Sequence, residues 1–301
     1  MIAPSGAAGY NRGVRIDLGV RLDPAALVAG PDGTGVRRLV PLARLAEAEG
    51  ADAVLLAGDD RRLRAGTVLP ADPYVLLGAL AEATERVALG CLAAGTAGRP
   101  PSLLAKLAAS LDVCSDGRAL AALAGPGEPP LEPASLGEAL EVVRAMLRVP
   151  GPSLSGARFA IRRAHNEPRA AGDEPVPLAL YVAQGDAEAD GALLELGARY
   201  AELTFVALRP GGEAALAGLA ERFSSSARAA GRVPATAVLE AVLEAAPEEA
   251  PGALAGRVAT ARASGAAGVV VDLCPPYDDA LERRLAAAIA AARAGGAGGG
   301  T

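Results

Sequence analysis

The sequence predicts an α/β fold, a single (β/α)8 TIM barrel, from three observations. Short apolar runs alternate with amphipathic helical patterns eight times along the 301 residues. Within residues 72–125 the order strand, helix, strand describes a parallel crossover unit, which is normally right-handed. The chain is also long enough for one such barrel, and eight repeats favour it over an open doubly wound sheet.

The expected strands are short and apolar, as in a buried parallel sheet. They cover residues 14–20, 53–57, 87–92, 119–124, 178–183, 203–207, 235–243 and 268–273. The seventh strand is alanine-rich and is assigned from its β-branched residues Thr236, Val238 and Val242. The Gly-, Pro- and Asp-rich segment after the first strand, to about residue 35, is expected to be a loop.

The expected helices follow the strands and carry apolar stripes at helical spacing. They cover residues 36–49, a segment opening at Asp72-Pro73, the stripe from Leu103 to Leu111, and residues 135–147, 186–199, 212–230, 253–264 and 278–294. Asp72 is expected to cap its helix, with Pro73 in the first turn. Gly50 is expected to end the first helix, and Ser135 with Glu138 forms a capping-box pattern.

Three segments fall outside this repeat. Residues 1–13 are expected to be a flexible start and residues 295–301 a disordered Gly-rich tail, which leaves residues 14–294 as one barrel domain. Residues 149–177 read as an irregular insert, because prolines, glycines and mixed charges interrupt every periodic pattern there.

Composition excludes several classes of protein. A hydrophobic content of 51% excludes a disordered chain, and a net charge of −6 with a pI near 5.1 disfavours nucleic acid and anionic membranes as partners. No apolar run is long enough to span a membrane, and the N-terminus lacks a secretory signal pattern. The three cysteines are few and far apart, which predicts no disulfide framework and no metal site, and a cytoplasmic location.

In a barrel the loops after the strands share one end, where ligands bind. The polar and reactive residues expected at that end are Arg21, Asp23, Asp59, Asp60, Arg61, Thr96, Arg99, Glu128, Gln184, Gly185, Asp186, Arg209, Glu244 and Cys274. Two neighbouring carboxylates such as Asp59 and Asp60 repel each other, so one of them can retain a proton for general acid catalysis.

Several blocks of the sequence resemble the luciferase-like monooxygenase superfamily, which includes bacterial luciferase and the coenzyme F420-dependent oxidoreductases. The resemblance is carried by LARLAEAEGADAVLLAGDD, DPYVLLGALAEATERVALG, RPPSLLAKLAASLDVCSDGR, SLGEALEVVRAML, FAIRR and PVPLALYVAQGDAEADGALLELGARYAE. These blocks follow the family's order over most of residues 14–206. The resemblance implies a deazaflavin or flavin lying across the C-terminal mouth of the barrel.

The resemblance also implies roles for individual residues. Asp59 and Asp60 occupy the place where the family has an aspartate and a histidine near the cofactor ring, and Glu128 lies near the place of an acidic residue over the ring. As catalytic candidates these three carboxyl groups are proton donors. The residues implied to contact the cofactor are Cys91, Thr96, Arg99, Gln184, Gly185 and Asp186.

The chain departs from the family pattern at two places. Both histidines of those loops are missing, and the only histidine, His165, falls in the insert. Asp186, Glu188 and Asp190 place negative charge at the helix start where the family holds the cofactor phosphate, and like charges disfavour an anion there.

Each candidate also has a structural alternative. Asp59, Asp60 and Arg99 fit a solvated surface, Glu128 fits a plain Pro-rich loop, and Cys91 fits a buried inert thiol. For the whole chain the leading hypothesis is F420-dependent hydride transfer to or from a small molecule or modified peptide. The alternatives are an FMN-dependent monooxygenase, a cofactor-free barrel enzyme using the carboxylates, and a degenerate barrel that serves as a binding or partner subunit. The resemblance also implies a homodimer or a heterodimer with a related chain.

Overall fold

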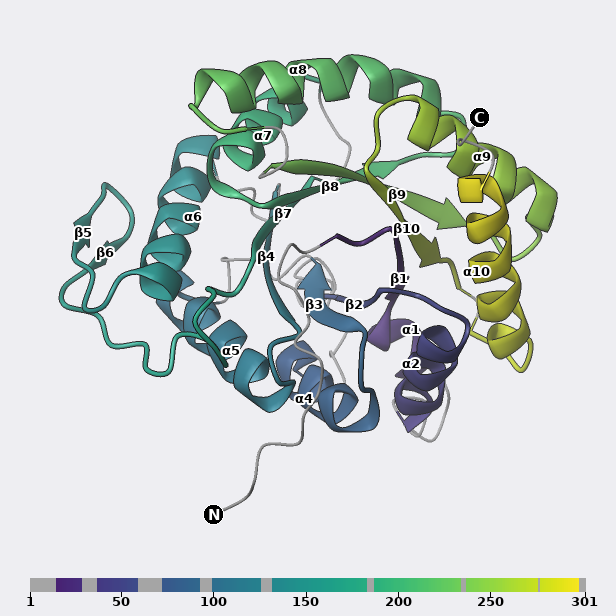
Figure 1. Cartoon of the computed structure of the whole chain (residues 1–301), viewed down its shortest axis with the longest axis horizontal. Coiled ribbons are helices and arrows are strands. Elements are labelled where there is room, and N and C mark those ends of the chain that lie inside the picture. Colours follow the sequence, from purple (N-terminus) through teal and green to yellow (C-terminus); the bar gives the residue numbers. More distant parts are fainter. Residues whose placement is uncertain are drawn as a thin grey trace.

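Eight parallel strands close into a barrel, as the sequence predicts (Figure 1). The computed structural model describes residues 15–28, 37–58, 72–92, 99–125, 132–182, 187–233, 237–275 and 277–297. The hydrogen-bonded order around the barrel is β1-β10-β9-β8-β7-β4-β3-β2. The strands are β1 (Leu18–Leu22), β2 (Ala53–Ala57), β3 (Ala88–Leu92), β4 (Ala119–Gly125), β7 (Leu178–Val182), β8 (Leu203–Leu208), β9 (Val238–Ala245) and β10 (Gly268–Leu273).

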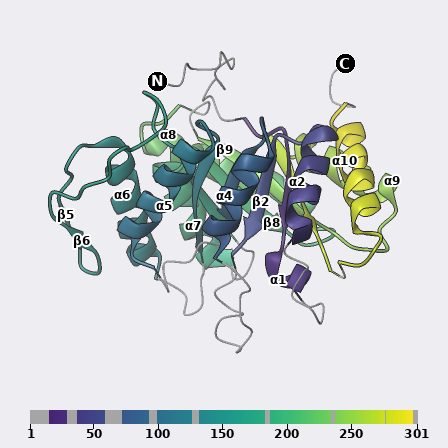
Figure 2. The ribbon, with the colours of Figure 1, turned by 90° about the horizontal axis from the view of Figure 1, so that it is seen from below.

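A ring of helices surrounds the strands (Figures 1 and 2). Its members are α2 (Leu39–Ala48), α4 (Pro73–Ala83), α5 (Pro101–Cys114), α6 (Pro133–Arg148), α7 (Ala187–Tyr200), α8 (Leu216–Ala229), α9 (Pro251–Ala263) and α10 (Leu281–Ala297). None of the helices within the described ranges combines the length and the apolar character needed to cross a membrane.

Two local signals in the sequence are confirmed. The carboxylate of Asp72 accepts a hydrogen bond of 2.8 Å from the Tyr74 N–H and caps α4. Gly50 follows α2 with a φ of +88°, a left-handed conformation that glycine adopts without a Cβ clash. The start of α4 and the end of α2 are therefore set by the capping residues that the sequence indicates.

The capping-box prediction for Ser135 and Glu138 is wrong. Helix α6 begins at Pro133, and its N-cap residue, Glu132, makes no side-chain cap hydrogen bond. Glu138 instead turns outward, and its carboxylate accepts the backbone N–H groups of residues 157–159 at 2.8–3.0 Å. These N–H groups belong to the insert, so a contact between distant segments replaces the local cap.

The insert is less irregular than its sequence indicates. It contains an antiparallel pair, β5 (Leu154–Ser155) and β6 (Ala160–Ile161), which projects outside α6 in Figure 1. The segment after the first strand also differs from its prediction as a loop, because it holds the short helix α1 (Pro24–Val28). Asp23 stabilises the start of α1 by accepting the Ala25 N–H at 2.8 Å.

Other differences are shifts of element boundaries. The first strand begins at Leu18 rather than at residue 14. The helix expected over residues 212–230 is divided into a 3-10 turn, η2 (Glu213–Ala215), and α8.

The side chains of the strands alternate between two cores. The core between the strands and the helices is the larger and contains most of the leucines. The core inside the barrel is filled by residues such as Ile16, Leu55, Leu92, Phe205 and Val270. We call the end of this interior where the strands begin the floor, and the end where they finish the mouth. Short helix α1, which follows β1, lies at the mouth end, below the helix ring in Figure 2.

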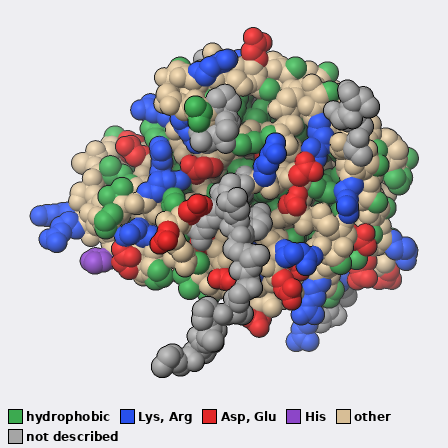
Figure 3. Space-filling view, in the orientation of Figure 1, with side chains coloured by type: hydrophobic (Ala, Val, Ile, Leu, Met, Phe, Trp, Pro, Cys, Tyr) green, Lys and Arg blue, Asp and Glu red, His purple; other side chains and the backbone are tan. Residues whose placement is uncertain are grey.

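Charged side chains of both signs are interspersed on the face seen in Figure 3. Because opposite charges alternate there, this face presents no broad field of one sign.

Candidate functional site

Most of the residues singled out from the sequence fall on the segments after β2, β3, β4 and β7. Asp59, Asp60, Thr96, Glu128, Gln184, Gly185 and Asp186 lie outside the described residues. Their roles stay predictions. The described part of the mouth is therefore built mainly from β1, β7, β9 and β10 and the segments that follow them.

Three side chains from separate strands meet inside the mouth, and we call them the mouth cluster: Arg21, Asp272 and Tyr181. Arg21 on β1 lies in register with Asp272 on β10, and the Arg21 guanidinium forms an ion pair with the Asp272 carboxylate. The guanidinium carbon also lies 5.4 Å from the centre of the Tyr181 ring, which comes from β7 across the barrel. The cluster thus joins the neighbouring strands β1 and β10 to β7 across the barrel.

The mouth cluster is mostly enclosed by protein. The side chains of Arg21 and Asp272 are 16% and 14% exposed. Within the described chain the Arg21 Nε–H group is buried and has no hydrogen-bond partner. A buried donor without a partner is uncommon in proteins and marks a position where a ligand or water oxygen can be bound.

Burial and pairing act in opposite directions on these charges. Burial by itself would lower the pKa of Arg21, but Asp272, with smaller contributions from Tyr181 and Asp23, outweighs burial and raises that pKa above its ordinary value. Burial raises the pKa of Asp272, and Arg21 opposes this rise without cancelling it. Glu244, at the end of β9, adds to the rise because it brings a second negative charge. Arg21 is therefore always charged, whereas Asp272 is a carboxylate that takes up a proton more readily than usual.

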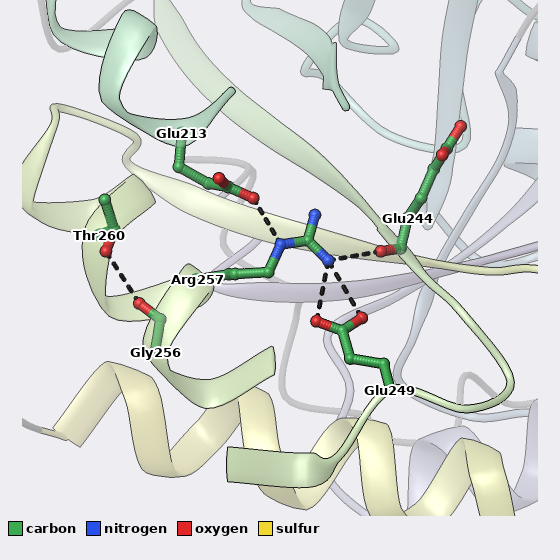
Figure 4. A network of polar contacts seen from close by, with 6 residues as sticks. All are labelled: Glu213, Glu244, Glu249, Gly256, Arg257 and Thr260. Carbon is green, nitrogen blue, oxygen red and sulfur yellow. Dashed lines mark hydrogen bonds and ion pairs between the residues drawn. The ribbon is translucent and has the colours of Figure 1, made fainter. Parts of the chain in front are cut away.

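Beside the cluster, a buried ion network holds the segments after β8 and β9 together (Figure 4). The Arg257 guanidinium donates to the Glu213 carboxylate at 2.5 Å and to both oxygens of Glu249 at 3.0 Å. It also donates to the backbone carbonyl of Glu244 at 2.7 Å. The side chain of Glu244 points away from Arg257 in Figure 4 and is exposed. The network fixes the backbone that carries Glu244.

Two candidates from the sequence lie on or after β3, away from the mouth cluster and the Arg257 network. Arg99, just before α5, forms an ion pair with Asp72 at the start of α4. Cys91 on β3 is fully buried in the core between the strands and the helices. That position is the one expected of an inert core thiol, the structural alternative for Cys91.

Cys274, at the end of β10, is also a poor nucleophile. Burial, together with the negative charge of Asp272, raises the pKa of its thiol to about 11. Since the thiolate is the reactive form, Cys274 is mostly unreactive at neutral pH. Among the residues that the structure describes, no group of three or more His, Cys, Asp or Glu side chains is arranged to hold a metal ion.

Sequence reasoning missed Asp272 and Tyr181, although it included Arg21 among the mouth residues. The signal that would have found Asp272 is the two-residue period of β10, in which residues 268, 270 and 272 share the inward face. Tyr181 follows from the same rule on β7, because Ala179 and Tyr181 both face inward.

A family model described as luciferase-like monooxygenase matches residues 18–293 of the chain. The chain belongs to this family. None of the curated proteins compared with the chain matches it.

Solved structures of similar fold include enzymes of two kinds. The coenzyme F420-dependent tetrahydromethanopterin reductase from Methanopyrus kandleri is 14% identical, with a TM-score of 0.70, over 92% of this chain and 98% of the reductase. An F420-dependent secondary alcohol dehydrogenase in complex with an F420–acetone adduct is also 14% identical, with a TM-score of 0.71, over 93% of this chain and 100% of the dehydrogenase. EDTA monooxygenase from Chelativorans sp. BNC1 is 16% identical, with a TM-score of 0.72, over 94% of this chain and 95% of that enzyme. At this identity the likeness shows a shared fold.

The described mouth offers two groups of the kind that contact a flat ring with a polar edge, such as that of a deazaflavin or flavin. A deazaflavin or flavin ring is flat and has a polar edge, which matches an aromatic side chain beside a buried N–H donor. Tyr181 and the Nε–H of Arg21 supply these two features. The neighbouring inward residues Ala124 and Ala207 are small and apolar. The residues predicted to contact the cofactor phosphate, Gln184, Gly185 and Asp186, lie outside the described chain.

Proposed function

We propose that this luciferase-like protein is an oxidoreductase that uses coenzyme F420 to transfer a hydride to or from a small molecule or modified peptide. The observation that carries the proposal is the length of the match to F420-dependent structures. The chain aligns with 98% and 100% of the two F420-dependent enzymes, so it contains the complete fold that those enzymes use. When bound, the deazaflavin would supply the atom that accepts or donates the hydride.

The mouth cluster would hold the ring. Arg21 would direct its unpartnered Nε–H towards an oxygen at the polar edge of the ring, and Tyr181 would orient Arg21 through their stacked contact. Asp272 would keep the guanidinium in place, because their ion pair fixes the direction in which Arg21 points. Both partners are mostly buried, so the pair also excludes water from this part of the mouth.

The remaining roles follow the family resemblance. Asp59, Asp60 or Glu128 would donate the proton that accompanies hydride transfer. Thr96, Arg99, Gln184, Gly185 and Asp186 would contact the cofactor, with Arg99 released in part from Asp72 to meet a negative group. Cys91 is left out of this set, because its thiol is buried among side chains that face the helices.

A second candidate is an FMN-dependent monooxygenase. The supporting observation is the similarity to EDTA monooxygenase, which extends over 95% of that enzyme. A third reading, a degenerate barrel that acts as a binding or partner subunit, rests on the missing histidines and the acidic residues near Asp186.

Titration of the purified chain with F420 and, separately, with FMN tests the proposal. We expect saturable quenching of F420 fluorescence with a dissociation constant in the range of about 1–10 μM, and weaker binding of FMN. Tighter binding of FMN than of F420 would instead support the monooxygenase. Saturable binding of neither would contradict both redox functions.

A pair of variants tests the site itself. Arg99→Met removes a charge at the rim, and we expect F420 to bind about tenfold more weakly, a loss of about 1.4 kcal/mol. Arg222→Met is the matched control, because Arg222 lies exposed on the outer helix α8. An equal loss of affinity in both variants would show a non-specific effect of charge.

A further inference from the structure

The floor of the barrel contains a buried carboxyl group that the proposed function does not use. Glu240 on β9 points inward and is 0% exposed. Its register neighbours are Phe205 on β8 and Gly268 on β10, neither of which carries a charge. Neither of its oxygens has a hydrogen-bond partner among the described residues. An ionised carboxylate in this position would lack the pairing that buried charges require.

The surroundings of Glu240 favour a neutral carboxylic acid. Burial raises its pKa from the ordinary 4.5 to about 8. The charged groups that face it are Arg262 from α9 and Arg15 from the entering chain, which oppose the rise, and Asp17, which adds to it. Arg262 is already engaged, because it donates to the Asp17 carboxylate at 2.7 Å and to the Asp17 carbonyl at 2.9 Å. The nearby Gly268 N–H also acts to lower the pKa, although it makes no hydrogen bond of normal geometry with the carboxyl group.

A backbone oxygen lies beside this acid. A Cβ added to Gly268 would be 1.8 Å from the Ile16 carbonyl oxygen and 2.5 Å from Glu240 Oε2. Both oxygens therefore occupy the space that a side chain at position 268 would fill. Two oxygens that approach each other repel unless a hydrogen lies between them. A protonated carboxyl group supplies that hydrogen, and a proton needs no additional room in a floor filled by Ile16 and Phe205.

We propose that Glu240 is a proton-operated latch, whose carboxyl O–H donates to the Ile16 carbonyl oxygen and ties the chain that enters β1 to the barrel floor. When Glu240 loses its proton, the donor is lost and the two oxygens repel each other. The entering chain then loses its contact with β9 at Ile16, and the packing of the Ile16 side chain in the barrel interior loosens, while Asp17 keeps its hydrogen bonds to Arg262. The latch is closed in neutral and acidic solution and opens as the pH rises above 8.

Hydrogen exchange of the backbone amides of residues 15–19, measured by mass spectrometry and corrected for the intrinsic effect of pH, tests the latch. In the natural chain we expect exchange to be about tenfold faster at pH 9 than at pH 7, because the ionised fraction of Glu240 sets the open population. Glu240→Gln retains an N–H donor and should exchange slowly at both pH values. Glu240→Met fills the space without a donor and should exchange rapidly at both.

Glu244→Gln is the matched control, since it removes an exposed carboxyl group at the other end of the same strand. It should leave the pH dependence of the natural chain unchanged. Equal exchange in the natural chain and in Glu240→Gln at pH 9 would overturn the latch, and this comparison stands even if Glu240→Met does not fold. A carbon-13 titration that places the Glu240 carboxyl pKa between 4 and 5 would also overturn it.

Discussion

Glu240 and Asp272 are two carboxyl groups in the same barrel interior, but they differ in whether a charged partner lies beside them. They lie on neighbouring strands, Glu240 at the floor beside Gly268 and Asp272 four residues further along, about 13 Å away at the mouth. Burial raises the pKa of both groups. Asp272 has Arg21 as an ion-pair partner that opposes the rise of its pKa, whereas Glu240 has no such partner among the described residues.

The comparison shows that burial has different consequences for a carboxyl group at the two ends of this barrel. At the mouth, a charged pair that is partly exposed can meet a ligand with little further desolvation. At the floor, the side chains close the interior, and burial favours the neutral form of a carboxyl group there. Three experiments test this difference, and they follow in order of decreasing effect.

The largest effect is expected from Gly268→Ala at the floor. The added methyl group would overlap the Ile16 carbonyl oxygen, and a backbone atom cannot move away as a flexible side chain can. We expect a loss of about 4 kcal/mol in the free energy of unfolding, measured by urea denaturation. Gly256→Ala in α9 is the control, because no atom lies within 4 Å of its added methyl group. The control should be neutral or more stable by up to about 1 kcal/mol, and equal losses in both variants would contradict the tight floor.

Removing Arg21 should leave Asp272 as an unpaired buried charge. We expect Arg21→Met to lose about 3 kcal/mol of stability at pH 7.5. Without Arg21 the pKa of Asp272 rises further, so the loss should shrink as the pH falls and the carboxyl group is protonated. Denaturation at pH 5.0 and pH 7.5 measures this change.

The double variant Arg21→Met with Asp272→Leu removes both charges and serves as the comparison for the single change. It should recover most of the lost stability at pH 7.5. A double variant no more stable than Arg21→Met would show that the mouth pair contributes through packing rather than through charge.

The smallest effect is expected from Glu240→Gln, and it depends on pH. Because the pKa of Glu240 is about 8 in the folded chain and 4.5 ordinarily, the folded chain binds a proton that the unfolded chain releases between these values. The free energy of unfolding of the natural chain therefore falls as the pH rises from about 4.5 to about 8, and Glu240 contributes no further change above that.

Glu240→Gln removes this dependence. A pKa of about 8 against 4.5 corresponds to at most about 4 kcal/mol between pH 5 and pH 9. We expect the stability of the variant relative to the natural chain to increase by about 2 kcal/mol over this range, because opening of the latch hydrates the ionised carboxylate. Thermal unfolding over this pH range gives the two profiles. Parallel profiles would mean that Glu240 is ionised in the folded chain at neutral pH.

Much of the fold could be predicted from the sequence, because local spacing and capping chemistry specify it. Strands β2 and β10 have the predicted boundaries, and Asp72 caps α4 as expected. The wrong capping box shows where local reasoning ends. Glu138 has the right type and spacing for a cap, but the insert offers it three backbone N–H groups at once. A single local N–H at the helix start cannot compete with three.

The candidate site was less accessible to sequence reasoning. Strand order places the residues after β2 to β7 at one end of the barrel, and the family resemblance implies their roles, but neither identifies the mouth cluster as a unit. Arg21 and Asp272 are 251 positions apart in sequence. No residue pattern in β1 or β10 predicts that these two side chains form a pair. Glu240 is one of two glutamates in an otherwise apolar strand, and its sequence neighbours do not show whether it faces solvent or the barrel interior.

The amino-acid sequence by itself determined the eight repeats of strand and helix and the membership of the chain in its family. It did so because apolar spacing is a local property and each repeat carries its own. Only the tertiary structure decided which charges are buried and which are paired. Closing the barrel brings β1 against β10, and this one contact both pairs Arg21 with Asp272 and brings the Ile16 carbonyl oxygen to Gly268, where Glu240 Oε2 also lies. Whether a buried carboxyl group is paired or unpaired therefore depends on residues that barrel closure brings next to it, and its neighbours in sequence do not indicate which residues these are.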